Sequence, residues 1–220
     1  MVVGTVSAME PTRLVGITLC VLVEGGDNHD AFRRLVEGLF AAGVRMLQIR
    51  DKRLPDDALV ERVRTAVAAA REIDPKSPPL VIVNDRVAIA ATALADGVHV
   101  GAGDMPVLEA RQVLGDAVII GRTAHTIDEA RDAVTSGATY LGVGPCFPST
   151  TKSFATHAPR EFLRAAAAQP LPVFAIGGIT IDRLAELRAL GIRRVAVAAA
   201  VTAVADPEAA ARRFLEALVE

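Results

Sequence analysis

Short apolar runs alternate with longer amphipathic stretches along most of the chain, and this alternation is the strongest constraint on its fold. Eight apolar runs are predicted to be buried strands, and the stretches after them carry apolar residues at helical spacing. The predicted strands are Gly16–Val23, Met46–Ile49, Leu80–Val83, Gly97–Val100, Val118–Ile120, Tyr140–Val143, Val173–Ile176 and Arg194–Val197. The predicted helices are Ala31–Ala42, Asp56–Glu72, Val87–Ala95, Val107–Leu114, Asp128–Ser136, Arg160–Ala167, Ile181–Ala189 and Pro207–Val219.

Eight strands that are each followed by a helix have the element count of a (β/α)8 TIM barrel, an α/β fold. The chain has 220 residues, which is compact for this fold and predicts a single domain with short loops over residues 13–220. Residues 1–12 are expected to form a loose N-terminal leader. An open doubly wound sheet is the alternative, but it favours a GxGxxG turn after the first strand, where this chain has Gly25-Gly26-Asp.

The composition excludes several classes of partner. A net charge of −2 gives no basic field for nucleic acid, and only 4% of the residues are aromatic, so base stacking is not expected. The longest apolar run, Leu14–Val23, is too short to span a bilayer. Cys20 and Cys146 lie far apart and form no redox or ligand motif, which favours reduced thiols in a cytoplasmic protein. The sequence does not decide whether the protein forms a homo-oligomer.

Polar residues follow nearly every predicted strand, and in a barrel these strand ends converge on one mouth. After the second strand, Gln48, Arg50 and Lys52 occur at every second position, so an extended chain places them on one face. Two cations and an amide suit an anion that carries several charges, although a solvated strand exit is the simpler interpretation of this segment alone.

Two carboxylates follow neighbouring strands and suggest a metal site. Asn84-Asp85 comes after the third strand, and Asp104 comes in the Gly101-Ala-Gly-Asp segment after the fourth. Two carboxylates are a usual protein contribution to a Mg²⁺ site that substrate phosphates and water complete. Taken singly, each aspartate is more simply a helix cap.

Two later segments suggest phosphate binding. Gly142–Lys152 joins glycines to the donors Ser149, Thr151 and Lys152, and Ile176-Gly-Gly-Ile179 follows the next strand. Glycine allows backbone N–H groups to approach an anion closely. Thr123, after the fifth strand, is a further residue that can reach the mouth.

These segments together resemble the thiamine-phosphate synthase family. The resemblance runs from about residue 14 to the C-terminus, and its motifs occur in the family's order and spacing. The motifs are Gln48-x-Arg-x-Lys52, Asn84-Asp85, His99-Val-Gly101 with Asp104, Gly144-Pro-x-Phe-Pro-x-x-Thr-Lys152 and Ile176-Gly-Gly-Ile179. The resemblance implies the joining of 4-amino-2-methyl-5-hydroxymethylpyrimidine diphosphate to 5-(2-hydroxyethyl)-4-methylthiazole phosphate, with release of diphosphate.

The resemblance also implies a role for each matching residue. Residues that hold the diphosphate are Gln48, Arg50, Lys52, Asn84 and Lys152, of which Arg50, Lys52 and Lys152 are the catalytic cations. Thr123 is a further substrate-binding residue, at a position where the family usually has a serine. Asp85 and Asp104 hold Mg²⁺. Residues that bind the thiazole phosphate are Ser149, Thr151, Gly178, Ala199 and Ala200. The family commonly has a serine where this chain has Ala199, so only backbone donors are expected there.

Three rivals remain for the function. A thiazole tautomerase on the same barrel has no use for a metal or for diphosphate, yet both predicted sets are present here. A non-catalytic regulatory homologue is expected to have lost the metal ligands. A sugar-phosphate isomerase needs a positioned acid/base pair rather than a metal–diphosphate cluster.

Overall fold

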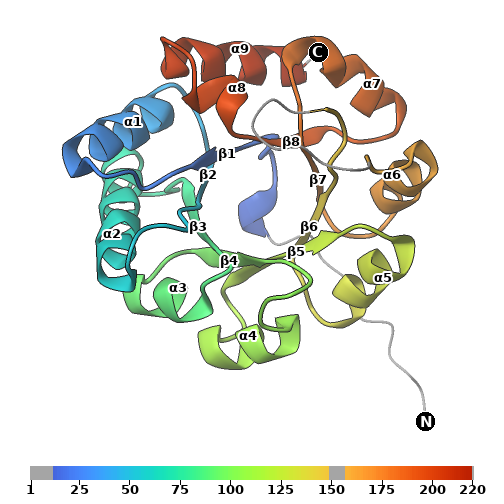
Figure 1. Cartoon of the computed structure of the whole chain (residues 1–220), viewed down its shortest axis with the longest axis horizontal. Coiled ribbons are helices and arrows are strands. Elements are labelled where there is room, and N and C mark those ends of the chain that lie inside the picture. Colours follow the sequence, from blue (N-terminus) through green and yellow to red (C-terminus); the bar gives the residue numbers. More distant parts are fainter. Residues whose placement is uncertain (1–11, 149–156, 220) are drawn as a thin grey trace.

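The structure, a computed structural model, describes residues 12–148 and 157–219. Eight parallel strands close into a barrel in chain order, so that β1 pairs with both β2 and β8. Figure 1 looks down this barrel and shows the strands at the centre and the helices in an outer ring. The predicted TIM barrel is confirmed, and the open doubly wound sheet is wrong because β1 and β8 are hydrogen-bonded to each other. The predicted leader lies outside the described residues, apart from Thr12.

The strands lie where the apolar runs predict them, with three differences. They are β1 (Leu19–Val23), β2 (Met46–Ile49), β3 (Leu80–Asn84), β4 (Gly97–Val100), β5 (Ile119–Ala124), β6 (Tyr140–Val143), β7 (Val173–Ile176) and β8 (Arg194–Val197). The first strand begins three residues later than predicted, since Gly16 has a φ of 76° that no strand adopts. β3 includes Asn84. β5 runs on to Ala124 because Arg122, Thr123 and Ala124 pair with β6.

The helices cover the outside of the barrel. They are α1 (His29–Ala41), α2 (Asp56–Ile73), α3 (Val87–Ala93), α4 (Val107–Leu114), α5 (Ile127–Thr135), α6 (Arg160–Ala167), α7 (Leu184–Ala189), α8 (Ala199–Thr202) and α9 (Pro207–Val219). The predicted helix Ile181–Ala189 is divided into a 3₁₀ turn, η2 (Ile181–Arg183), and α7. The short helix α8 was not predicted, because its sequence Ala-Ala-Val-Thr carries no amphipathic pattern.

Two apolar cores result from the alternation of side chains along each strand. One lies between the barrel and the helices and includes Leu47, Val81 and Leu141. The other fills the barrel itself and includes Met46, Ile82 and Phe174. Residues that point into the barrel beyond this inner core therefore reach its mouth at the carboxyl ends of the strands.

A 3₁₀ turn closes the opposite end of the barrel. In η1 (Thr12–Leu14), Leu14 is fully buried and belongs to the inner core. Figure 1 shows this blue segment within the ring of strands. Arg13 holds it in place through an ion pair with Asp96, whose Oδ1 lies 2.6 Å from Arg13 Nη2. Among the described residues, no helix is long and apolar enough to cross a membrane.

Candidate functional site

A small chamber lies inside the barrel, above the inner apolar core. Its volume is about 150 Å³, and it combines apolar walls with a few convergent polar groups. Its lining residues are Cys20, Leu22, Gln48, Arg50, Asn84, Asp85, His99, Thr123, Tyr140, Gly142, Phe174, Ile176 and Ala196. Such a chamber suits a small planar ring that carries hydrogen-bonding groups.

Four polar side chains from four strands follow one another across this chamber. The Gln48 side chain lies close enough to the Tyr140 hydroxyl to oppose the effect of burial, which raises the pKa of Tyr140 well above its ordinary value. That hydroxyl lies 3.0 Å from His99 Nδ1, and His99 Nε2 lies 2.8 Å from Thr123 Oγ1. Burial, reinforced by the charge of Arg122, lowers the pKa of His99 to about 4, so its ring is neutral at pH 7. The orientation of the Thr123 hydroxyl therefore depends on which nitrogen of His99 carries the proton.

Two glycines in the strands make room for this chain of side chains. A Cβ on Gly121 would overlap the rings of Tyr140 and His99. A Cβ on Gly142 would lie 2.9 Å from His99 Cε1. Glycine is uncommon inside strands and often marks a close approach, so these two positions are the sequence signal that His99 and Tyr140 need space.

An acidic pair lies beside the predicted cations at the edge of the chamber. Burial and the adjacent Asp104 carboxyl, which is close enough for a hydrogen bond, raise the pKa of Asp85. The charges of Lys52 and Arg50 act in the opposite direction, and Lys52 Nζ lies 3.9 Å from Asp85 Oδ2. The structure thus brings together four of the residues that the sequence predicts for the diphosphate and its metal.

Local backbone geometry points the two carboxylates at each other. Asp85 has a φ of 63°, a conformation that Asp and Asn adopt more readily than most residues. Its N–H donates to the His99 carbonyl at 2.8 Å. Asp104 Oδ2 accepts a 2.7 Å hydrogen bond from the N–H of Gly101, and Arg122 donates to the Gly101 carbonyl. Arg122, whose purpose the sequence leaves open, thus braces the turn that carries Asp104.

The donor set fits a hard cation. Within residues 12–148 and 157–219, no group of three or more His, Cys, Asp or Glu side chains could hold a metal ion. Two adjacent carboxylates alone give too few ligands for a cage built only of protein, which is the usual situation for Mg²⁺ shared with substrate phosphates.

A larger cavity of about 640 Å³ lies next to the chamber. It lies over the carboxyl ends of β1, β7 and β8, and it shares Leu22, Arg50, Ile176 and Ala196 with the chamber. The remaining lining residues are Glu24, Pro148, Gly177, Gly178, Ile179, Thr180, Arg183, Val197, Ala198, Ala199, Ala200 and Ala203. Because the two spaces share these four residues, ligands that occupy both of them would be in contact.

The glycine pair after β7 packs closely against the segment after β6. Gly177 and Gly178 have φ values of 98° and 62°, and a Cβ on Gly178 would overlap the carbonyl oxygens of Phe147 and Pro148. The Phe147 N–H donates to the Gly177 carbonyl at 3.0 Å. Glycine at 178 is therefore required by the protein's own backbone before any ligand is considered, a reason that the sequence alone does not reveal.

The remaining predicted residues fall into two groups. Asn84 lines the chamber, and Ala199 and Ala200 begin α8 at the outer cavity. Ser149, Thr151 and Lys152 lie outside the described residues. The sequence patterns do not single out Tyr140 or Arg183, which line the two cavities, and they include His99 only as part of the His99-Val-Gly101 motif.

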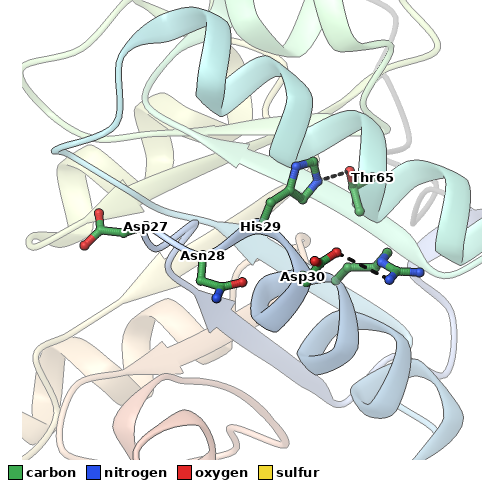
Figure 2. Close-up of a pocket in the computed structure, with 6 residues that line it drawn as sticks. Asp27, Asn28, His29, Asp30 and Thr65 are labelled. Atoms are coloured by element: carbon green, nitrogen blue, oxygen red, sulfur yellow. Dashed lines mark hydrogen bonds and ion pairs between the residues drawn. The ribbon is translucent and has the colours of Figure 1, made fainter.

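A further depression of about 670 Å³ lies on the outside of the barrel, where the first turn of α1 meets α2 (Figure 2). Most of its polar groups already have partners in or beside the depression. His29 Nε2 lies 2.7 Å from Thr65 Oγ1, and Asn28 Oδ1 accepts from the Ala31 N–H as the cap of α1. Asp30 pairs with Arg33 at 3.4 Å. These contacts account for the residues as helix capping and packing, so the barrel mouth remains the candidate site.

Comparison with known proteins identifies relatives along most of the chain. The family model described as thiamine monophosphate synthase matches residues 19–201. A thiamine-phosphate synthase from Anaeromyxobacter dehalogenans is 42% identical over 96% of this chain and 91% of its own length. The solved structure of thiamine phosphate pyrophosphorylase from Pyrococcus furiosus is 30% identical and superposes with a TM-score of 0.77, covering 92% of this chain and 96% of that one.

Some relatives are longer proteins. A thiamine biosynthesis bifunctional protein ThiM/ThiE from Symbiobacterium thermophilum is 42% identical over 91% of this chain, but the match covers only 40% of that relative. The chain thus corresponds to less than half of this bifunctional protein and to nearly all of the Anaeromyxobacter enzyme.

Proposed function

The chain belongs to the thiamine monophosphate synthase family, and from that premise we propose that it joins a hydroxymethylpyrimidine diphosphate to a hydroxyethylthiazole phosphate. The C–O bond between the pyrimidine methylene and diphosphate breaks, and a C–N bond forms between that methylene and the thiazole nitrogen. The products are thiamine phosphate and diphosphate. One observation carries this proposal: Arg50 and Lys52 lie beside the Asp85–Asp104 pair, at a chamber that adjoins a second cavity.

The two cavities suit the two precursors. The chamber inside the barrel is lined by the polar side chains of Gln48 and Thr123 and by the aromatic side chains of Tyr140 and Phe174, a setting for the flat aminopyrimidine ring. The outer cavity is large enough for the thiazole and its phosphate, and the glycine pair Gly177-Gly178 lines it. Arg50 lines both spaces, so it is placed to contact the leaving diphosphate where the two substrates meet.

Charge neutralisation is the main chemical task of the site. As the C–O bond lengthens, negative charge builds on the diphosphate, and Arg50 and Lys52 stabilise that charge. We assign Lys152 the same task on the basis of the sequence motif. The aminopyrimidine can delocalise the positive charge left on its methylene, so no protein nucleophile is required. Cys20 and Cys146 fit this view because burial raises the pKa of each thiol to about 12, which keeps both protonated.

We further propose that the enzyme uses Mg²⁺, with Asp85 and Asp104 as its protein ligands. When bound, the ion supplies Lewis-acid stabilisation of the diphosphate oxygens. The raised pKa of Asp85 supports this assignment, since two carboxyl groups that repel each other are relieved by a cation between them. Lys52 can partly neutralise the pair before a substrate binds.

Replacing each carboxylate by its amide tests the assignment, because asparagine tolerates the φ of Asp85 and can accept the Gly101 N–H as Asp104 does. We expect Asp85→Asn and Asp104→Asn each to lower kcat by about 100-fold or more, and to raise the Mg²⁺ concentration needed for half-maximal rate. The assay follows diphosphate release and thiamine phosphate formation from both precursors.

Asp128→Asn serves as the control, since Asp128 lies exposed on α5 and pairs with Arg131, three residues along the same helix. Wild-type rates in either site variant at limiting Mg²⁺ would contradict the metal assignment. Absence of thiamine phosphate with the wild-type protein would contradict the proposed reaction itself.

A further inference from the structure

Arg183 is a cation of the outer cavity that no motif points to. It ends η2, immediately before α7, and it is half-buried at the cavity wall. Its Nη1 donates to the Gly178 carbonyl at 2.9 Å and lies 3.5 Å from the Pro148 carbonyl. Its guanidinium lies over the ring of Phe147, 4.8 Å from the ring centroid. The side chain thus contacts both of the segments, after β6 and after β7, that approach each other at this end of the cavity.

These contacts leave much of the guanidinium available. Arg183 carries five N–H donors in a rigid plane, and its hydrogen bonds to described residues all come from Nη1. No carboxylate in the described part of the chain forms an ion pair with it. A hydrogen bond from Thr180 is the main cause that lowers the pKa of nearby Asp182, and the charge of Arg183 adds a smaller effect in the same direction. Stacking on Phe147 fixes the plane of the group without using its donors.

The wall of the outer cavity carries few charged side chains. Among its described lining residues, only Arg50 and Arg183 are positively charged, and Arg50 also lines the inner chamber, where it acts on Asp85. The one carboxylate on the wall, Glu24, lies 3.5 Å from Arg53. After β8, the neighbour of β7, the first residues of α8 are alanines, so Ala199 offers a phosphate no hydroxyl.

We propose that Arg183 binds the phosphate group of the thiazole substrate directly and makes this protein selective for the phosphorylated thiazole. This inference rests on the proposed function. Nη1 braces the glycine loop, while Nη2 and Nε donate to phosphate oxygens in the two-point geometry that guanidinium groups favour. Arg183 thereby supplies donors on the cavity wall at a site where Ala199 provides no side-chain donor.

The test compares two thiazole substrates that differ only in the phosphate. For wild type, Arg183→Met and Arg183→Lys, kcat/KM is measured with the thiazole phosphate and with the corresponding thiazole alcohol, at saturating pyrimidine diphosphate. We expect Arg183→Met to lower kcat/KM for the phosphate by about 10- to 100-fold, mainly through KM, and to change the value for the alcohol much less. Lysine, a cation without the two-point geometry, should restore part of the loss.

Arg160→Met is the matched control, because Arg160 is an exposed arginine that pairs with Glu186 on α7. It should leave both values unchanged. If Arg183→Met lowers both values equally, and Arg183→Lys does not restore selectivity, Arg183 only braces the loop and the inference is wrong. If the wild-type enzyme forms no product from either thiazole, the proposed function is wrong and the inference is wrong with it. This outcome is seen in the wild-type protein, whereas failure of the inference alone is seen only in the Arg183 variants.

Discussion

At the scale of single residues, His99 shows how burial converts an ordinary side chain into a fixed element of the site. Its two nitrogens contact Tyr140 and Thr123, so the ring is held from both sides. Because its pKa lies about 4, well below the ordinary 6.5, the ring donates through one nitrogen and accepts through the other at neutral pH. Protonation would force both nitrogens to donate and would place a positive charge inside the barrel, which burial disfavours.

The stability of the protein should therefore decrease in mild acid. The unfolded chain binds a proton at His99 more readily than the folded chain, so this contribution is complete above pH 6.5 and is lost as the pH falls towards 4. At pH 5 the expected loss is about 2 kcal/mol, and below pH 4 it approaches about 3 kcal/mol. Urea unfolding between pH 7.5 and 4.5 measures it.

Replacing His99 by glutamine isolates this effect, since glutamine does not titrate. His99→Gln should be less stable than wild type at pH 7.5, and the difference should shrink as the pH falls. His29→Gln, at an exposed histidine, is the control and should follow the wild-type curve. A difference between His99→Gln and wild type that stays constant across this pH range would contradict the prediction.

At the scale of elements, two buried charged residues, Asp51 and Arg62, hold the loop after β1 in place beside the loop after β2. Asp51, which lies between Arg50 and Lys52, accepts hydrogen bonds from the N–H groups of Gly26, Arg53 and Leu54. Burial alone would raise the pKa of Asp51, but these three donors outweigh it and lower the pKa. From α2, Arg62 donates to the carbonyls of Gly25 and Gly26. The loop with the two cations is thus fixed to the loop after β1.

Asp51→Asn should destabilise this junction. An amide presents an NH₂ group to at least one of the three N–H donors, so one buried donor loses its acceptor at a cost of about 1–3 kcal/mol. We expect a lower free energy of unfolding and a higher KM for the pyrimidine diphosphate. Asp57→Asn, on the exposed first turn of α2, is the control. A variant with wild-type stability and KM would show that Asp51 does not position the loop.

How far the sequence predicts these elements depends on the range of the interactions involved. The strands of the barrel and the cations and carboxylates at their ends follow from local patterns, and the structure does bring Arg50, Lys52, Asp85 and Asp104 together. The junction at Asp51 and the chain from Gln48 to Thr123 depend on contacts between different strands and loops. No local pattern encodes which polar groups will meet there. The four residues of α8, which begins at Ala199, are likewise too few and too uniform for a helical pattern to predict them.

At the scale of the whole molecule, closure of the barrel joins the two ends of the fold at one cavity. The same outer cavity is lined by Leu22 and Glu24, at the end of β1, and by residues 196–200 and Ala203, from the end of β8 to just past α8. β1 and β8 are also hydrogen-bonded neighbours, with Val21 opposite Val197. A ligand in this cavity therefore contacts the first and last strands together.

Ligand binding should accordingly protect both segments at once. We expect thiazole phosphate to slow amide hydrogen exchange around Leu22–Glu24 and around Ala196–Ala203 in parallel, because ligand stabilises the closed arrangement. Exchange in α4, on the far side of the barrel, should change little. Mass spectrometry of peptic fragments measures all three regions. Protection limited to only one of the two strands would mean that the ligand does not bridge the closure.

The position of β8 also has a consequence for the protein during its synthesis. A nascent chain that has emerged from the ribosome only as far as β7 already carries the cations and carboxylates of the inner chamber, but it lacks the wall formed by β8 and α8 and leaves β1 without its second neighbour. Such a chain presents an open sheet edge and half of a binding site. The outer cavity proposed for the thiazole is thus completed late in translation, when β8 and α8 have emerged and the two ends of the fold meet.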